Sequence, residues 1–367
     1  MQRGIAALIW AAALATCHAP RTAAAQDNRQ HTEERGHEMH DEGDSDHDNV
    51  AADHSDHDRN GGGCRCDGRY HARFAPDDFP EPFGFSLREG WFDELPHSHF
   101  SRLGTPQIHF FFVEPAYPDH DLFVDFIYTR TDEGKEYEIA TELELAFTRR
   151  IGLVIEVPGV VLDPLDAPQR EGFGDLVIAP RFLLADFDRF MMSFNLEIAT
   201  PTGDADRGLG TGETVLGPSL TGWLDLGNWW TSGFRLGVET GLESGETEMA
   251  YDFALARTFC GPALFGHRCG RCGGRASHDD HGHDEHGHGD HDDEEHHFPA
   301  GMTSLIAEIN ARTLTSGPDD GRSTAELLFG VSYCISEHMQ LRVGYQFPLY
   351  RPSDLEERIV TGVIWHF

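Results

Sequence analysis

The sequence predicts an all-β protein, namely an antiparallel up-and-down transmembrane β-barrel. From Asp121 to the end of the chain, apolar side chains recur at every second position in one stretch after another. This period of two is typical of strands with one apolar and one polar face. The connections between the stretches alternate between short and longer ones, as they do at the two ends of an outer-membrane barrel.

The last hairpin, residues 338–367, shows the alternation most clearly. One face of its first strand is apolar and consists of Met339, Leu341, Val343, Tyr345, Phe347 and Leu349. The final strand repeats the pattern and ends in Trp365 and Phe367. In a bilayer such a row faces lipid, with its aromatic residues at the interface. A soluble β-sandwich would also alternate, but the opposite face here carries small residues and charges of both signs, as a wet barrel interior does.

The same reasoning places the other strands in order, with boundaries uncertain by about 2–4 residues. Short turns are expected near residues 148–150, 185–188, 225–228 and 336–337, and longer loops at 161–171, 201–212, 316–321 and 351–355. The count of about twelve is even, which puts both barrel ends on one rim. The expected strands are 121–131, 135–147, 150–159, 172–185, 188–200, 213–226, 228–241, 246–259, 300–314, 322–335, 338–350 and 357–367.

The rest of the chain divides by composition. Residues 1–25 have Arg3, an apolar run and three alanines, which predicts a secretory signal peptide. Residues 26–66 are a His- and acid-rich segment expected to be disordered, and residues 67–120 form an irregular segment under or inside the barrel mouth. Within residues 67–120, the sequence does not decide whether Ile108–Glu114 is an extra strand or part of the irregular segment. The barrel then spans 121–367, with 260–298 as a disordered His-rich insert.

The two His-rich segments carry much of the formal net charge of −35. Imidazole and carboxylate groups together suit zinc, nickel, cobalt or copper. The insert is therefore either a divalent-metal binding segment or a solvated acidic linker, and no cofactor is required. Its candidate metal ligands are His278, His281, His283, His286, His288, His291, His296 and His297.

The cysteines allow two interpretations. An exported chain meets oxidising conditions, so disulfides are expected first and metal thiolates second. The pairing is not determined by the sequence. The candidates for disulfide bonds are Cys64, Cys66, Cys269 and Cys272.

The polar face of the predicted strands supplies candidate pore-lining residues. Their mixed signs allow either a water-filled pore with weak cation preference or a lumen closed by Glu–Arg pairs. The candidates are Glu138, Glu142, Glu144, Glu156, Arg181, Glu197, Arg235, Glu239, Asp252, Glu308, Arg312, Glu326 and Arg342.

Three segments and the aromatic C-terminus resemble one known family. The segments are GFGDLVIAPRFLL (172–184), LEIATPTGDADRGLGTGE (196–213) and GPSLTGW (217–223). They are similar to the outer-membrane channel family labelled MetA-pathway of phenol degradation, over roughly residues 121–367 without the insert. The resemblance implies a channel or transport role for small hydrophobic molecules and carries over no catalytic residues. The two His-rich segments depart from the family's pattern.

We therefore expect an outer-membrane channel for passive passage of small solutes, with both termini and the His-rich segments in the periplasm. Its partners would be outer-membrane lipid, small solutes or metal ions, and barrel-insertion machinery, but no nucleic acid. The alternatives are a barrel that anchors metal-sequestering tails and an outer-membrane hydrolase. No G-x-S-x-G, H-E-x-x-H or P-loop pattern occurs, so we do not expect an enzyme.

Overall fold

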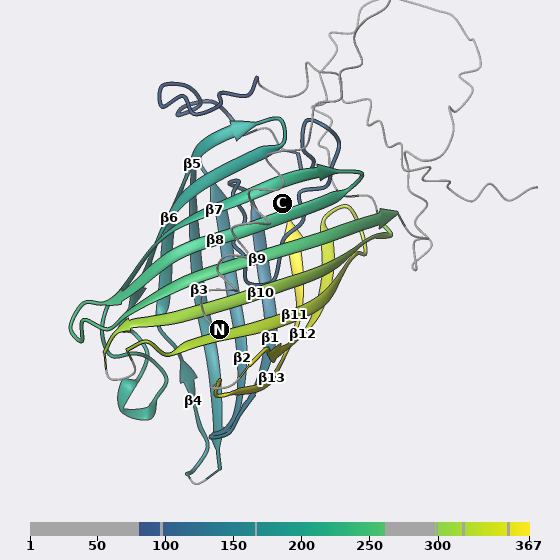
Figure 1. The fold of residues 1–367 in the computed structure, drawn as a ribbon. Helices are drawn as coiled ribbons and strands as arrows, with labels where there is room; N and C mark the ends of the chain where they lie inside the picture. The colour runs from purple at the N-terminus through teal and green to yellow at the C-terminus, as the bar shows by residue number, and fades with distance from the viewer. Residues whose placement is uncertain are drawn as a thin grey trace, which may run out of the picture. The chain divides into compact units, whose positions relative to one another are not determined.

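The strands of the computed structural model form one closed antiparallel barrel (Figure 1). The structure describes residues 81–95, 98–165, 167–260, 298, 300–317, 320–350 and 353–367. The strands are β1 (Asp121–Thr131), β2 (Gly134–Ala146), β3 (Ile151–Pro164), β4 (Arg170–Phe173), β5 (Leu176–Phe187), β6 (Phe190–Thr200), β7 (Val215–Gly227), β8 (Trp230–Gly241), β9 (Thr247–Cys260), β10 (Met302–Ser316), β11 (Ser323–Cys334), β12 (Met339–Pro348) and β13 (Leu355–His366).

Strands that follow one another in the sequence pair in the sheet, except that β5 pairs with β3 and not with β4. The pairing of β1 with β13, from Asp121 opposite His366, closes the ring. Twelve strands complete the ring, and β4 is an additional strand. The predicted fold class is thus confirmed. Among the described residues, no helix has the length and apolarity needed to cross a membrane.

The region predicted as a long loop at 161–171 is different in the structure. β3 continues to Pro164, and β4 pairs back onto it, with Leu162 opposite Arg170. The prediction of a single strand over 172–185 was also wrong at its start, because β4 ends at Phe173 and β5 begins at Leu176. The run Val160, Val161 and Leu162 explains the extension, since β-branched and large apolar residues favour extended backbone.

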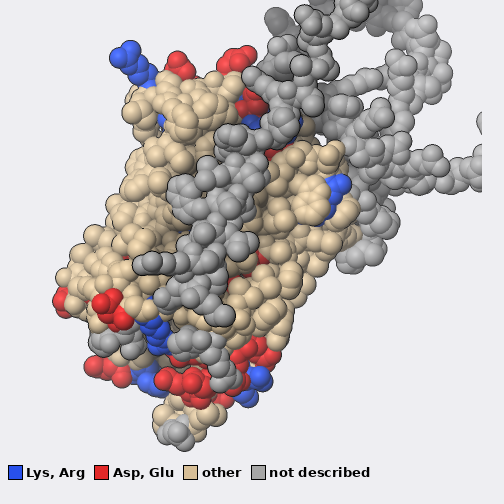
Figure 2. All heavy atoms as spheres, in the orientation of Figure 1, with Lys and Arg blue, Asp and Glu red and all other residues tan. Residues whose placement is uncertain are grey.

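The two faces of the wall differ in the way the alternation predicts. Leu341, Val343 and Tyr345 of β12 are 40%, 49% and 45% exposed, whereas Gln340 between such positions is buried. On β13, Trp365 is exposed and its neighbours Ile364 and His366 are buried. Over the face seen in Figure 2, charged side chains gather toward the two ends of the barrel and leave the wall between them largely uncharged. Such an exterior is that of a barrel in contact with lipid.

The two ends of the barrel have different connections. We call the end where β1 begins and β13 ends the chain-end rim, and the opposite end the loop rim. Turns of two to four residues at 147–150, 188–189, 228–229 and 335–338 join strands on the chain-end rim, where β9 also ends and β10 begins. Asn228 and Trp229 have φ of 52° and 60°, as a two-residue hairpin turn requires. The loop rim carries the longer β6–β7 connection at 201–214.

The glycine-rich motifs in the sequence form one structure on the loop rim. The carboxylate of Asp175 accepts hydrogen bonds from the backbone N–H of Gly203 at 2.9 Å and of Thr211 at 2.7 Å. A Cβ at Gly210 would lie 2.5 Å from Asp175 Oδ1, so this position needs glycine. Partial burial would raise the pKa of Asp175, but these N–H donors outweigh it and lower the pKa below its ordinary value. The motifs therefore organise the β6–β7 loop.

We expect Asp175→Asn to loosen the β6–β7 loop while leaving the barrel folded. The amide can accept at only one oxygen, whereas the carboxylate accepts at both. Because the folded-state pKa is lowered, the wild-type loop should keep its order at neutral pH and lose it as the pH falls through that pKa. Limited proteolysis of the detergent-solubilised protein, read by mass spectrometry, should show faster cleavage within 201–214. Asp204→Asn is the matched control, because the Asp204 side chain makes no capping hydrogen bond. Equal cleavage of both variants would contradict this assignment.

Val343→Arg tests the lipid-facing wall. Val343 lies in the middle of β12 and is 49% exposed. An arginine at the bilayer midplane should lower the free energy of unfolding by about 2–4 kcal/mol. Met339→Arg, on the same face at the chain-end rim, should cost only about 0–1 kcal/mol. Guanidinium unfolding in lipid vesicles measures both variants, and equal costs would mean that the wall has no apolar band.

Candidate functional site: the closed lumen

A segment without strands crosses the barrel interior. The described residues 81–95 and 98–120 form only isolated bridges, so the extra strand considered at Ile108–Glu114 is not present. We call residues 107–118 the plug. Phe110, Phe111 and Tyr117 of the plug belong to one buried apolar cluster with Trp223 and Leu328 on the interior of the wall. The plug therefore fills the lumen at this level.

One end of the plug is held by two charged residues of the wall. The carboxylate of Glu308 on β10 accepts hydrogen bonds from the backbone N–H of Phe111 at 2.5 Å and of Phe112 at 3.0 Å. Arg342 on β12 donates to the carbonyl of Phe110 at 2.9 Å and to the carboxylate of Asp125 at 2.9 Å. Backbone groups that would otherwise lack partners inside the barrel are thus satisfied by side chains of the wall.

The other end of the plug contacts the opposite part of the wall. Arg181 on β5 donates to the carbonyl of Tyr117 at 3.2 Å, and Ser193 on β6 donates to the carbonyl of Ala116. The Tyr117 hydroxyl donates to the carbonyl of Gln107 at 2.7 Å, which closes the plug on itself. Burial raises the pKa of Tyr117 well above its ordinary value, so its hydroxyl stays protonated.

Small residues of the wall make room for the plug rings. A Cβ at Gly330 would overlap the ring of Phe111, and a Cβ at Gly233 would overlap the ring of Phe110. Both glycines lie in strands, where glycine costs stability relative to a residue with a side chain. Their presence on β8 and β11 is explained by the close approach of the aromatic rings.

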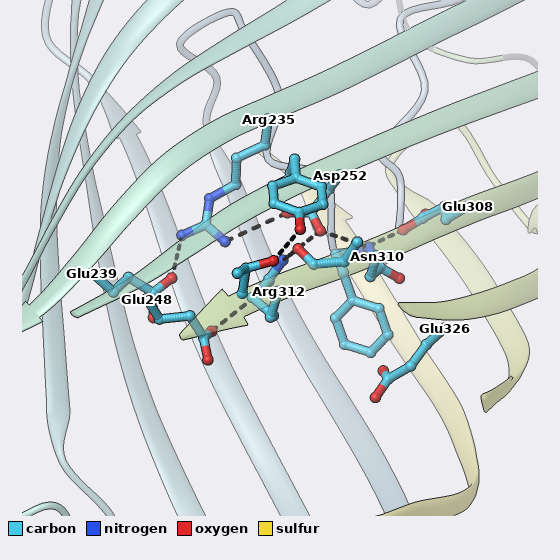
Figure 3. A network of polar contacts seen from close by, with 12 residues as sticks. Arg235, Glu239, Glu248, Asp252, Glu308, Asn310, Arg312 and Glu326 are labelled. Carbon is cyan, nitrogen blue, oxygen red and sulfur yellow. Dashed lines mark hydrogen bonds and ion pairs between the residues drawn. The ribbon is translucent and has the colours of Figure 1, made fainter. Parts of the chain in front are cut away.

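The wall beyond the plug carries a network of ion pairs (Figure 3). Arg235 pairs with Glu197 and Glu239, each at 3.0 Å. Asp252 lies between two guanidinium groups, 2.5 Å from Arg312 and 3.8 Å from Arg235. Nearer the plug, Arg181 pairs with Glu144 at 3.1 Å and with Glu114 of the plug at 2.7 Å. Each of these three arginines is therefore paired with at least one carboxylate.

A polar hollow opens beside this network on the loop rim, and we call it the vestibule. Its volume is about 330 Å³. The guanidinium of Arg358, which lines it, lies 5.5 Å from the ring centroid of Phe112, so one lining residue of the vestibule also contacts the plug. Its charged lining residues are Glu248, Arg312, Arg322, Glu326, Asp354 and Arg358, which balance in sign.

All thirteen predicted pore-lining residues lie in strands with their side chains on the interior face, as the strand register shows. Glu144, Arg181, Glu308 and Arg342 surround the plug, while Arg312 and Glu326 line the vestibule. The predicted signal peptide, the His278–His297 ligands and Cys64, Cys66, Cys269 and Cys272 lie outside the described residues. Their assignments stay predictions.

Sequence reasoning missed a second group of polar residues at the chain-end rim. We call His99, His109, Asp119, Asp121 and His366 the His–Asp cluster. The strand alternation places Asp121 and His366 on the interior face, but His99, His109 and Asp119 belong to the irregular segment and carry no such signal. Of the described residues, His109, Asp121 and His366 form one group of side chains close enough to hold a metal ion, and Glu114, Glu142 and Glu144 form another.

These features define a transmembrane β-barrel whose lumen is closed by a segment of its own chain. Neither a protein-family model nor a curated protein matches the sequence, so the resemblance to the phenol-degradation channel family is not confirmed. The fold is similar to solved outer-membrane barrels. An outer membrane channel from Pseudomonas putida F1 is 13% identical, with a TM-score of 0.46 over 68% of this chain and 96% of that one.

Two solved porin structures are similar to this chain to about the same degree. The NanC porin is 10% identical, with a TM-score of 0.42 over 67% of this chain and 100% of that one. The KdgM porin is 11% identical, with a TM-score of 0.40 over 67% and 99%. Sequence identities and TM-scores this low do not identify a relative. The function proposed below depends on the geometry of this chain alone.

Proposed function

We propose that this protein is an outer-membrane channel for small polar solutes, and that the plug must move before solutes pass. The observation that carries the proposal is the combination of a closed barrel, a charged vestibule open on one rim and a non-strand segment across the lumen. A barrel that served only as an anchor would need neither a polar hollow nor glycines that admit the plug rings.

The outer membrane is supported by the aromatic residues near both rims. Trp230, Phe259 and Trp365 are exposed near the chain-end rim. Near the loop rim, Tyr128 and Tyr137 have ring centroids 5.4 Å apart, and Tyr345 and Phe347 have theirs 5.9 Å apart. Aromatic girdles at both interfaces and short turns on the periplasmic side are characteristic of outer-membrane barrels. We therefore place the chain-end rim, and both termini, in the periplasm.

The solute class follows from the vestibule. Its charged groups balance in sign, and a volume of about 330 Å³ suits a small molecule. The carboxylates and guanidinium groups there favour polar, charged or zwitterionic solutes over the hydrophobic molecules that the family resemblance implies. Passage toward the chain-end rim would require the Glu308 and Arg342 contacts to the plug to break.

The His-rich segments add metal gathering to this proposal on the basis of their composition. Deleting residues 277–297 from the full chain should reduce the number of zinc ions bound, as measured by atomic emission after equilibrium dialysis, and leave conductance in planar bilayers unchanged. Unchanged zinc binding would contradict metal gathering by this segment. Zinc binding without any conductance would instead support a barrel that anchors metal-sequestering tails.

Glu308→Ala should favour the open channel. It removes the acceptor for the N–H groups of Phe111 and Phe112, and an intramolecular hydrogen bond contributes about 0.5–1.5 kcal/mol. The ratio of conducting to closed channels in planar bilayers should therefore rise by about tenfold. Glu308→Gln keeps one carbonyl acceptor and should give a smaller increase.

The matched control for this experiment is Glu239→Gln. Glu239 lies on the same interior face, but it contacts Arg235 rather than the plug, and Arg235 keeps Glu197 as a partner. Its open fraction should stay near that of the wild type. If Glu308→Ala gives a heat-modifiable, folded barrel with wild-type conductance, the plug does not limit passage.

A further inference from the structure

The His–Asp cluster joins the segment that precedes the barrel to the seam where the barrel closes. Asp121 is the first residue of β1 and lies opposite His366, the last residue of β13. His99, His109 and Asp119 come from the segment that enters the lumen. None of the five residues is more than 8% exposed. The lipid bilayer and the barrel wall would thus exclude bulk water from this group.

The carboxylate of Asp121 is at the centre of the cluster. Its Oδ1 lies 2.6 Å from His366 Nδ1, and its Oδ2 lies 2.8 Å from His109 Nε2. Asp119 Oδ2 lies 3.3 Å from His99 Nδ1 and 4.0 Å from His109 Nε2. His109, Asp121 and His366 each offer a ligand atom within 4.8 Å of the other two.

Several of these buried atoms make no hydrogen bond within the described part of the chain. They are both ring nitrogens of His109, Asp121 Oδ2 and His366 Nε2. The contact between His109 Nε2 and Asp121 Oδ2 is short enough for a hydrogen bond but does not have the geometry of one. A buried polar atom without a partner costs about 1–3 kcal/mol, so an occupant that contacts these atoms would stabilise the fold.

A divalent transition-metal ion would be a partner for these buried nitrogen and oxygen atoms, which make no hydrogen bond. Neutral imidazole nitrogen and carboxylate oxygen are both ligands of zinc, and they bind through lone pairs that point toward a common centre. Two such atoms 2.8 Å apart, without hydrogen-bond geometry between them, are close enough to bind one ion. A sodium or calcium ion would instead require more oxygen ligands than the cluster offers.

We propose that the His–Asp cluster binds one divalent transition-metal ion of the zinc class through His109, Asp121 and His366. Asp119 and His99 lie beside these ligands, and either can complete four-coordination or orient a ligand by hydrogen bonding. The burial of the site predicts a structural ion rather than a catalytic one, because a catalytic ion keeps a position open to water or substrate. These ligands are different residues from the predicted ligands His278–His297, and the site does not depend on the proposed channel function.

The bound ion would hold the plug segment to the barrel wall. It would connect His109, two residues before Phe111, to the paired ends of β1 and β13. The same atoms admit one other arrangement, in which the carboxylates pair with protonated imidazoles and no metal binds. Metal measurements on the whole chain distinguish the two arrangements.

The test compares the full-length wild type with His109→Gln/His366→Gln. Each protein is loaded with Zn²⁺ and dialysed against a weak chelator, and the retained zinc is counted per chain. The wild type should retain about one equivalent more than the double variant, because the His-rich segments are the same in both. After replacement with Co²⁺, the visible absorption of a low-symmetry cobalt site should likewise be reduced in the double variant.

His120→Gln is the control, since His120 is adjacent in sequence but its ring lies against Phe367 rather than in the cluster. It should retain the wild-type equivalents and spectrum. If the double variant does not give the heat-modifiable folded band, His109→Gln alone is measured, because this residue lies outside the strands. A folded variant with the wild-type zinc content and cobalt spectrum would overturn the proposal.

Discussion

The structure depends on the closure of its sheet, because a strand edge left open in hydrocarbon would leave a row of backbone groups without hydrogen-bond partners. The pairing of β1 with β13 removes that edge, and its register places Asp121 opposite His366. Once the ring is closed, alternation determines where every wall side chain points. Val343 and Trp365 face outward, whereas Arg342 and His366 face inward. Because the apolar side chains of each strand must face lipid, the polar side chains that alternate with them point into the lumen.

The interior meets a second constraint, which is that buried charges need partners. Arg181 and Arg342 are buried in the wall, and each is paired with a carboxylate. Each also donates to a carbonyl of the plug, so the residues that neutralise the wall hold the plug as well. Glu308 also holds the plug, because its carboxyl group accepts hydrogen bonds from the backbone N–H groups of Phe111 and Phe112. The charge network and the closure of the lumen are therefore parts of one arrangement.

The fold was largely predictable because lipid on one side and polar groups on the other impose a period of two on the sequence. That period located the strands and the interior face, including Glu308, Arg181 and Arg342. It gave no information on the plug, whose path depends on contacts with distant strands such as those of Phe111 with Gly330. It also missed β4, because a short hairpin extending a strand resembles a loop in sequence. The His–Asp cluster was missed since its members come from three separate parts of the chain.

Hydrogen exchange over residues 107–118, measured by mass spectrometry on the protein in lipid nanodiscs, tests the central claim most directly. These residues form no strand, yet Glu308 accepts the N–H groups of Phe111 and Phe112 inside the barrel. The structure predicts that their amides exchange as slowly as those of the barrel strands. Exchange of this segment at the rate of an unstructured peptide would contradict the account, because the lumen would then be open.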